Sequence, residues 1–125
     1  IASITRASRT VLHYNDMGVW RLLLRTEADS DELERFAEFY LSAVARHDRE
    51  QQTDWLTTLE TYLEENGNLR ATARALGLHR NTVAYQVEHI ARLLGKKLDD
   101  PEVRLNLQVA LRARLLLKAR NRPTI

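Results

Sequence analysis

Three consecutive polar residues, His79, Arg80 and Asn81, follow a turn at Gly77 and precede a stretch with helical apolar spacing. Side chains of these types can form hydrogen bonds with base edges in the major groove of DNA. Arg makes a two-pronged contact with O6 and N7 of guanine, and Asn pairs with adenine in the same way. We therefore expect base contacts from His79, Arg80 and Asn81, followed by Thr82, Tyr85 and Gln86.

The residues around Gly77 have the spacing of a helix–turn–helix unit. Ala73 stands four residues before the glycine, where a larger side chain would keep two helices apart. Leu76 and Leu78 flank the turn, and Val83 follows six residues after the glycine on the inner face. In such units the second helix enters the major groove and its first turn reaches the bases. The alternative is an ordinary helical hairpin with a glycine turn.

Charge is divided unevenly along the chain. The net charge is only +2, but residues 1–66 contain 7 Lys and Arg against 13 Asp and Glu, whereas residues 67–125 contain 12 against 4. A basic half favours a polyanionic partner. An unevenly charged solvated surface would give the same counts. The excess continues around the turn, because residues 67–98 hold six basic residues and one acidic residue, Glu88.

Several residues near the turn are placed to meet the phosphate backbone. Arg70 and Arg74 lie one helical turn apart on the helix before the glycine. The free N–H groups at the start of that helix, after Asn68, also suit a phosphate. Phosphate contacts position a protein on DNA without specifying a sequence. The predicted phosphate contacts are Arg70, Thr72, Arg74 and Lys96.

The first expected helix begins near position 29, where apolar residues start to recur every three or four positions. Asp29 with Glu32 resembles a capping box. This helix should end near Arg46 or His47, before a polar linker over 47–52. Residues 1–28 contain a possible short strand, and we interpret them as the remnant of an upstream domain or a linker.

Cap and stop signals predict four further helices. Thr53 or Asp54, Asn68 and Asp100 are suitable N-caps, and Gly95 is a suitable stop. The expected ranges are about 54–66, 69–76, 80–94 and 101–120. The sequence therefore predicts an all-α fold of about five helices. Its helical domain covers 29–125, its helix–turn–helix core lies at about 68–94, and a short, possibly β remnant precedes it.

Other classes of function have little support. Cys is absent, which excludes disulfides and thiolate chemistry and fits a reducing, cytoplasmic location. The four His lack zinc-site spacing, and the four Gly form no phosphate-binding loop. We therefore expect no metal, no cofactor and no enzyme activity. The longest apolar runs are far shorter than the roughly 20 residues of a membrane span, so no membrane association is expected.

The stretch from Thr58 to Leu111 resembles the C-terminal helix–turn–helix domain of PucR/CdaR-type bacterial transcription regulators. The matching pieces are "TLETYLEENGNLRATARALGLHRNTVAYQVEHIARLLG" and "LDDPEVRLNLQVAL". The family joins a "TL..YL" helix to a "GN...TA..L..HRNT..YR...I" core and an "LDDP..R..L..AL" helix. This resemblance, over more than fifty residues, implies a sequence-specific DNA-binding domain of a bacterial transcription regulator, with double-stranded DNA as its partner.

The resemblance also implies roles for particular residues. The core is similar to the DNA-binding end of the factor for inversion stimulation, in which the two residues after the turn read bases. Those two residues align with His79 and Arg80. Gln86 departs from the family, which usually has Arg there. The segment "HYNDMGVWRLLL" resembles the part that precedes this domain, after a sensory or nucleotide-cyclase-like region. An effector is therefore expected to bind upstream, outside this chain.

Apolar residues lie on two sides of the last helix. The two stripes are Leu105, Val109, Ala113 and Leu116 on one side and Leu107, Leu111 and Leu115 on the other. One side can cover the DNA-binding unit and the other can pack on a second subunit. We predict a homodimer, since helix–turn–helix proteins commonly read half-sites about 34 Å apart. Alternatively, both sides are filled within the chain. The rival function is a helical protein-interaction or oligomerisation module that does not bind DNA.

Overall fold

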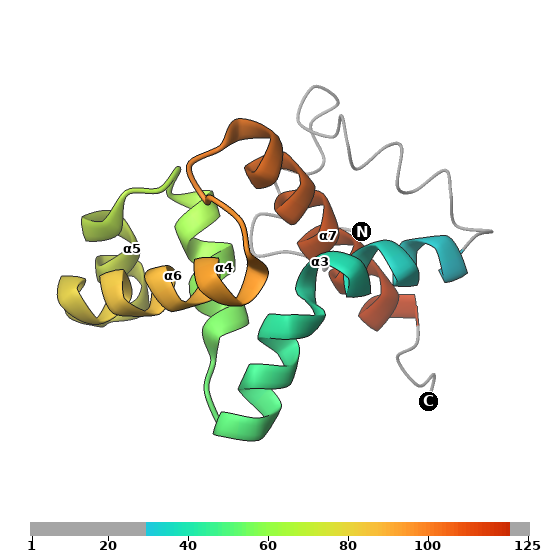
Figure 1. Cartoon of the computed structure of the whole chain (residues 1–125), viewed down its shortest axis with the longest axis horizontal. Coiled ribbons are helices and arrows are strands. Elements are labelled where there is room, and N and C mark those ends of the chain that lie inside the picture. The colour runs from blue at the N-terminus through green and yellow to red at the C-terminus, as the bar shows by residue number, and fades with distance from the viewer. Residues whose placement is uncertain (1–29, 121–125) are drawn as a thin grey trace. The chain divides into compact units, whose positions relative to one another are not determined.

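The computed structural model describes residues 30–120, and all regular structure in this range is helical. The helices are α3 (Ser30–Gln51), α4 (Trp55–Glu64), α5 (Leu69–Leu76), α6 (Arg80–Leu94) and α7 (Pro101–Arg120) (Figure 1). The predicted all-α fold is confirmed for these residues. The predictions for residues 1–28 and for Asp29 lie outside the described range. No helix in 30–120 is long and apolar enough to span a membrane.

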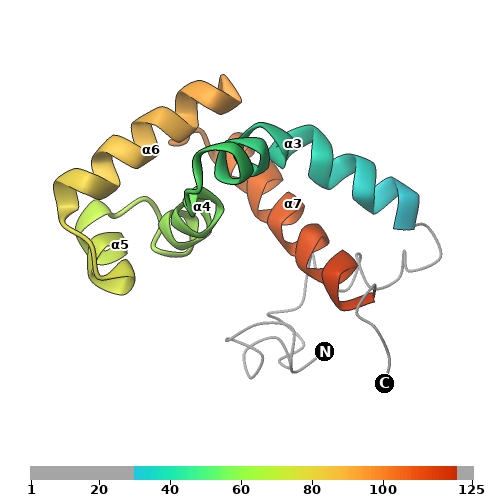
Figure 2. The ribbon, with the colours of Figure 1, turned by 90° about the horizontal axis from the view of Figure 1, so that it is seen from below.

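Helices α4, α5 and α6 pack against one another within a compact unit of residues 39–108 (Figure 2). Leu59 of α4 and Val83 and Ile90 of α6 are completely buried. Val83 and Ile90 are seven residues apart, so they lie on one face of α6. Complete burial of such side chains contributes roughly 1.5–3 kcal/mol each to the free energy of unfolding. The opposite face of α6 remains available to solvent.

Local signals set the bounds of α5 and α6, which match the predicted ranges. The side chain of Asn68 caps α5 by accepting a hydrogen bond from the backbone N–H of Ala71 at 2.9 Å. Gly77 and Gly95 end the two helices with φ values of 70° and 65°. Only glycine adopts this left-handed conformation without a steric cost. The sequence therefore determines the length of both helices locally.

The end of α3 differs from the prediction. The helix continues to Gln51 rather than ending near Arg46 or His47. No Gly or Pro interrupts residues 47–51, so nothing in that segment stops a helix. Gln52 ends it with a positive φ of 56°. The predicted polar linker is therefore almost entirely the last turn of α3.

Asp48, in that last turn of α3, caps the start of α4. Its carboxylate accepts hydrogen bonds from the backbone N–H groups of Trp55 and Leu56 at 2.8 and 3.0 Å. The hydroxyl of Thr53 donates to the same carboxylate at 2.6 Å. The predicted cap residue Asp54 occupies the N-cap position, but its side chain makes no capping hydrogen bond. A side chain from the preceding helix therefore satisfies the first N–H groups of α4.

Arg104 anchors the first part of α7 to two turns of the same unit. Its Nε donates to the backbone oxygen of Leu98 at 2.8 Å, and its Nη2 donates to that of Asn66 at 3.3 Å. Gly67 follows with a φ of 79°, and a Cβ there would collide with the guanidinium. The turn before α5 is therefore held against the start of α7.

The described part of the second unit consists of residues 30–38 and 109–120. In it, Leu33 and Ala37 of α3 form a small apolar cluster with Ala113 and Leu116 of α7. Of the residues in the two predicted stripes on α7, Leu105 is 51% exposed, so its side is not covered at that point. The buried residues of α7 are Leu107, Ala110, Ala113 and Leu116.

Candidate nucleic-acid interface

The turn between α5 and α6 has the geometry that its sequence predicts. The N–H of Leu78 donates to the backbone oxygen of Ala73 at 3.0 Å, which closes the end of α5. Gly77 has no neighbour near the position of a Cβ, so the positive φ rather than space favours glycine there. Ala73 is 6% exposed, which agrees with the need for a small side chain. This turn sets the direction in which α6 begins.

The first turn of α6 presents its side chains to solvent. His79 is the N-cap, and its Nδ1 accepts a hydrogen bond from the backbone N–H of Asn81 at 2.9 Å. Arg80, Asn81 and Thr82 are exposed, and Tyr85 is 57% exposed. Five of the six predicted base-contact residues therefore lie at one exposed end of α6. The buried face of the same helix holds them in place.

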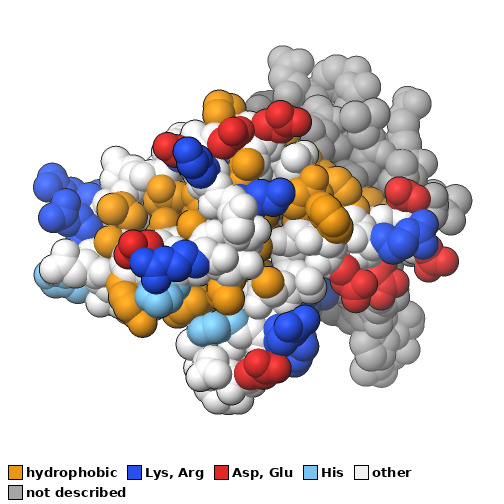
Figure 3. Space-filling model, viewed as in Figure 1, with side chains coloured by type: hydrophobic (Ala, Val, Ile, Leu, Met, Phe, Trp, Pro, Cys, Tyr) orange, Lys and Arg blue, Asp and Glu red, His pale blue; other side chains and the backbone are white. Residues whose placement is uncertain are grey.

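Helix α5 adds positive charge to the same three-helix unit. Arg70 and Arg74 are exposed on α5, one turn apart. Neither α5 nor α6 has an acidic residue in its first turn. In Figure 3, basic side chains and a histidine gather at the edge formed by α5 and the beginning of α6. The N-termini of both helices therefore combine a positive dipole end with cationic side chains.

Thr72 does not belong to this surface. Its side chain is completely buried, and its hydroxyl donates to the backbone oxygen of Asn68 at 2.7 Å. The predicted phosphate contact from Thr72 is therefore wrong. The residue packs inside the three-helix unit, where its hydroxyl is satisfied by its own helix.

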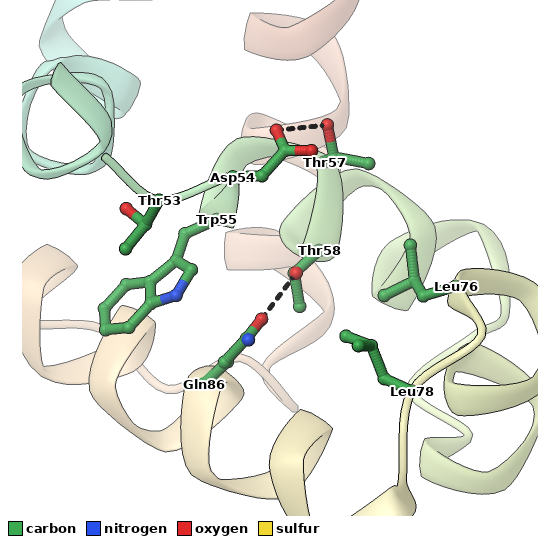
Figure 4. A pocket seen from close by; sticks show the side chains of 8 residues that line it. All are labelled: Thr53, Asp54, Trp55, Thr57, Thr58, Leu76, Leu78 and Gln86. Atoms are coloured by element: carbon green, nitrogen blue, oxygen red, sulfur yellow. Dashed lines mark hydrogen bonds between the residues drawn. The ribbon is translucent and has the colours of Figure 1, made fainter. Parts of the chain in front are cut away.

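Gln86 is half-buried, and its side chain reaches α4. Its Oε1 accepts a hydrogen bond from the hydroxyl of Thr58 at 2.7 Å, and Thr58 is 3% exposed (Figure 4). The two side chains lie at a hollow of about 310 Å³ that Leu76 and Leu78 also line. The carboxamide oxygen therefore links α6 to α4, and this contact argues against a base contact from Gln86.

Lys96 lies at the other end of α6. It follows the helix-terminating Gly95, and its Nζ lies 6.0 Å from the centroid of the Tyr40 ring. A helix of this length extends about 22 Å. The structure therefore separates Lys96 from the basic side chains near the turn.

His89 is a residue of this surface that the sequence analysis set aside. Its ring centroid lies 4.2 Å from that of Tyr85 and 6.0 Å from that of Trp55. Trp55 is buried, so His89 connects the exposed Tyr85 ring to the core. The i, i+4 spacing of Tyr85 and His89 is the signal that could have identified the pair. His89 therefore supports Tyr85 in its exposed position.

Known proteins share this part of the chain. The model of the PucR C-terminal helix-turn-helix domain matches residues 55–113. The chain is 38% identical over 107 residues to the purine catabolism regulatory protein of Bacillus subtilis (strain 168). The aligned region covers 86% of this chain and 19% of that protein. It is 39% identical over 88 residues to an uncharacterized protein in the pkwA 5′ region of Thermomonospora curvata, 70% of this chain and 48% of that protein.

A third relative is the proline-responsive transcriptional activator PutR of Bacillus subtilis (strain 168). The identity is 31% over 98 residues, 78% of this chain and 24% of that protein. The chain thus spans about half the length of these relatives or less. No solved structure matches the chain significantly. The matched range covers α4, α5, α6 and most of α7, which includes the exposed turn. Residues 55–113 therefore belong to the PucR C-terminal helix-turn-helix family and form a DNA-binding domain.

Proposed function

We propose that this domain binds double-stranded DNA in a sequence-specific manner, with the first turn of α6 in the major groove. The observation that carries the proposal is the pairing of cations with positive helix ends. Arg80 is the first residue of α6 and Arg70 the second of α5, and neither helix has an acid in its first turn. A cation at a helix N-terminus lowers stability by roughly 0.3–1 kcal/mol. A phosphate backbone removes this repulsion.

The exposed residues divide into two proposed roles. Arg80, Asn81 and His79 contact base edges, with Thr82 and Tyr85 beside them, because they occupy the turn that enters the groove. Arg70 and Arg74 contact phosphates, because they lie on the helix that crosses the backbone in such units. Lys96 contributes through its charge alone, at the far end of α6.

A homodimer is part of the proposal, since paired half-sites are the usual target of this architecture. Within residues 39–108, Phe39 is 75% exposed, Leu105 51% and Leu93 39%. Large apolar side chains at the surface suit a subunit contact. Light scattering measures the mass of the particle in solution. If that mass corresponds to one chain at all concentrations, with and without an operator duplex, the dimer is removed from the proposal.

The whole protein is proposed to be a cytoplasmic regulator whose effector binds outside this chain. Two relatives are a regulator of purine catabolism and a proline-responsive activator by their names. By this similarity, the proposed signal for the present protein is a small molecule.

The test begins with selection of bound sequences from a random DNA pool, followed by measured affinities for the best site. Arg80→Ala is expected to lower specific affinity by about 1–3 kcal/mol and to relax preference at one base pair. Arg74→Ala should weaken all sequences alike and reduce the slope of log affinity against log salt by about 0.9.

Arg92→Ala is the matched control. It removes the same charge from the other end of α6, where Arg92 pairs with Glu88 at 3.1 Å and both are exposed. Its effect should be small. If the selection enriches no DNA sequence and the chain binds an acidic protein instead, the rival function, a protein-interaction module that does not bind DNA, would be favoured.

A further inference from the structure

The cap of α6 determines which atom of His79 faces outward. Nδ1 accepts the hydrogen bond from the backbone N–H of Asn81. A ring nitrogen that accepts carries no proton, so the proton of the neutral ring is on Nε2. His79 is exposed, and no hydrogen bond from Nε2 is found to residues 30–120. The outward nitrogen is therefore a hydrogen-bond donor.

A fixed donor distinguishes among the four bases in the major groove. Guanine presents N7 and O6, adenine presents N7 and thymine presents O4, all of which accept hydrogen bonds. Cytosine presents only the N4 amino group, which donates. A donor that faces a donor leaves both groups without a partner, which costs free energy in a water-poor interface. The contacted base should therefore be any base except cytosine.

We propose that His79 is a specificity-determining residue that excludes cytosine at one position of each half-site. The proposal rests on the proposed function, because it requires the start of α6 to lie against base edges. The same ring performs both tasks: Nδ1 caps the helix and Nε2 reads the base. The cap also fixes the ring orientation, so the donor points in one direction before DNA arrives.

The use of His as the N-cap supports these two separate roles of Nδ1 and Nε2. Ser, Thr, Asp and Asn are the preferred N-caps. The neighbouring α5 uses Asn68 in this way, and α7 uses Asp100. These shorter side chains satisfy the helix but extend less far from the backbone. A residue that departs from a local rule within an otherwise regular element often marks a functional position.

The tautomer of His79 in the free chain is the first test. Long-range ¹⁵N–¹H correlation spectra distinguish the Nε2–H form of a neutral imidazole from the Nδ1–H form. The expected result is the Nε2–H form for His79, with a cross-peak pattern that disappears in His79→Ser and identifies the residue. The Nδ1–H form, or equal amounts of both, would overturn the proposal even if the domain binds DNA.

Base preference is the second test, with two variants that both supply a capping oxygen in place of Nδ1. His79→Ser retains the cap but its hydroxyl is too short to reach the base, whereas His79→Asn retains the cap and offers an amide donor that extends further than the hydroxyl but less far than Nε2. The wild-type chain should bind the selected site about 5- to 150-fold more tightly than the same site with cytosine at the contacted base. His79→Ser should bind the two sites alike, and His79→Asn should recover part of the discrimination.

The readouts separate the possible outcomes. Melting temperatures of the two variants close to wild type would show that the cap is intact, so that changes in DNA binding report the lost donor. A loss of affinity in His79→Ser that is equal for all sequences would mean that Nε2 donates to a phosphate, and would overturn the assignment to a base. If the wild-type chain selects no sequence, the proposed function fails, whereas the tautomer measurement still reports on the cap.

Discussion

The starts of α6 and α7 meet the same physical requirement in different ways. At α7, Oδ1 of Asp100 accepts hydrogen bonds from the backbone N–H groups of Glu102 and Val103 at 2.8 and 3.2 Å. At α6, the neutral ring of His79 accepts one such bond, and Arg80 follows. Both helix ends carry a positive partial charge. Acidic residues balance it at α7, whereas a cation increases it at α6.

Under the proposed function, this difference separates a helix end that serves stability from a helix end that serves binding. The arrangement at α7 satisfies the preferences for an acidic N-cap, proline at the first position and glutamate in the first turn. The arrangement at α6 gives up part of that stabilisation. Only a negatively charged partner at the start of α6 would recover it. The two ends therefore predict opposite effects of substitution on stability and on DNA binding.

Charge reversal at the start of α6 should have the largest effect on binding. Arg80→Glu replaces a cation with an acid that suits the helix dipole, so the free energy of unfolding should rise by about 0.3–1 kcal/mol. DNA affinity should fall by more than the roughly 1–3 kcal/mol expected for truncation. Thermal denaturation and fluorescence anisotropy measure the two quantities. Loss of stability together with retained affinity would show that Arg80 serves the fold rather than DNA.

Gln86 tests the packed side of the same helix. Gln86→Ala leaves the buried hydroxyl of Thr58 without its partner, so the free energy of unfolding should fall by about 1–3 kcal/mol. The preferred DNA sequence should not change, because the carboxamide oxygen faces α4. Thr58→Val is the matched control, since it removes the buried donor and should be less destabilising. A changed base preference in Gln86→Ala would restore Gln86 as a base contact.

Removal of the cap at α7 should affect the fold but not the DNA site. Asp100→Ala deprives two backbone N–H groups of their acceptor, so stability should fall by about 0.5–2 kcal/mol. Affinity for the selected site, corrected for the folded fraction, should equal that of the wild-type chain. Urea unfolding and binding isotherms together make the comparison. Weaker DNA binding by the folded variant would place the start of α7 in the interface.

Much of the fold could be predicted from the sequence because its signals are local. The capping residues Asn68 and Asp100 and the stops Gly77 and Gly95 lie within one turn of the helix ends that they define. These signals gave the correct bounds for α5, α6 and α7. They also placed His79 and Arg80 at the exposed end of α6.

The predictions that differ from the structure depend on contacts between residues that are distant in sequence, or on which face of a short helix is buried. Gln86 is polar and looks exposed, but its partner Thr58 is 28 residues earlier. Thr72 is polar on a short helix, and only the packing of three helices shows that its position is interior. Helix α3 ends later than predicted because no Gly or Pro interrupts residues 47–51, and the hydrogen bond from Trp55 to Asp48 in its last turn is not visible from periodicity. Helical periodicity alone does not contain this information.

The most direct test of the central claim is an NMR titration of the ¹⁵N-labelled chain with the selected duplex. If the starts of α5 and α6 are the DNA-binding surface, the largest amide shift changes should occur at residues 68–71 and 79–85. The amides at the start of α7, near 100–104, should remain almost unchanged. Largest changes at the start of α7, or changes spread evenly over residues 30–120, would contradict the assignment of the first turn of α6 as the part that reads DNA.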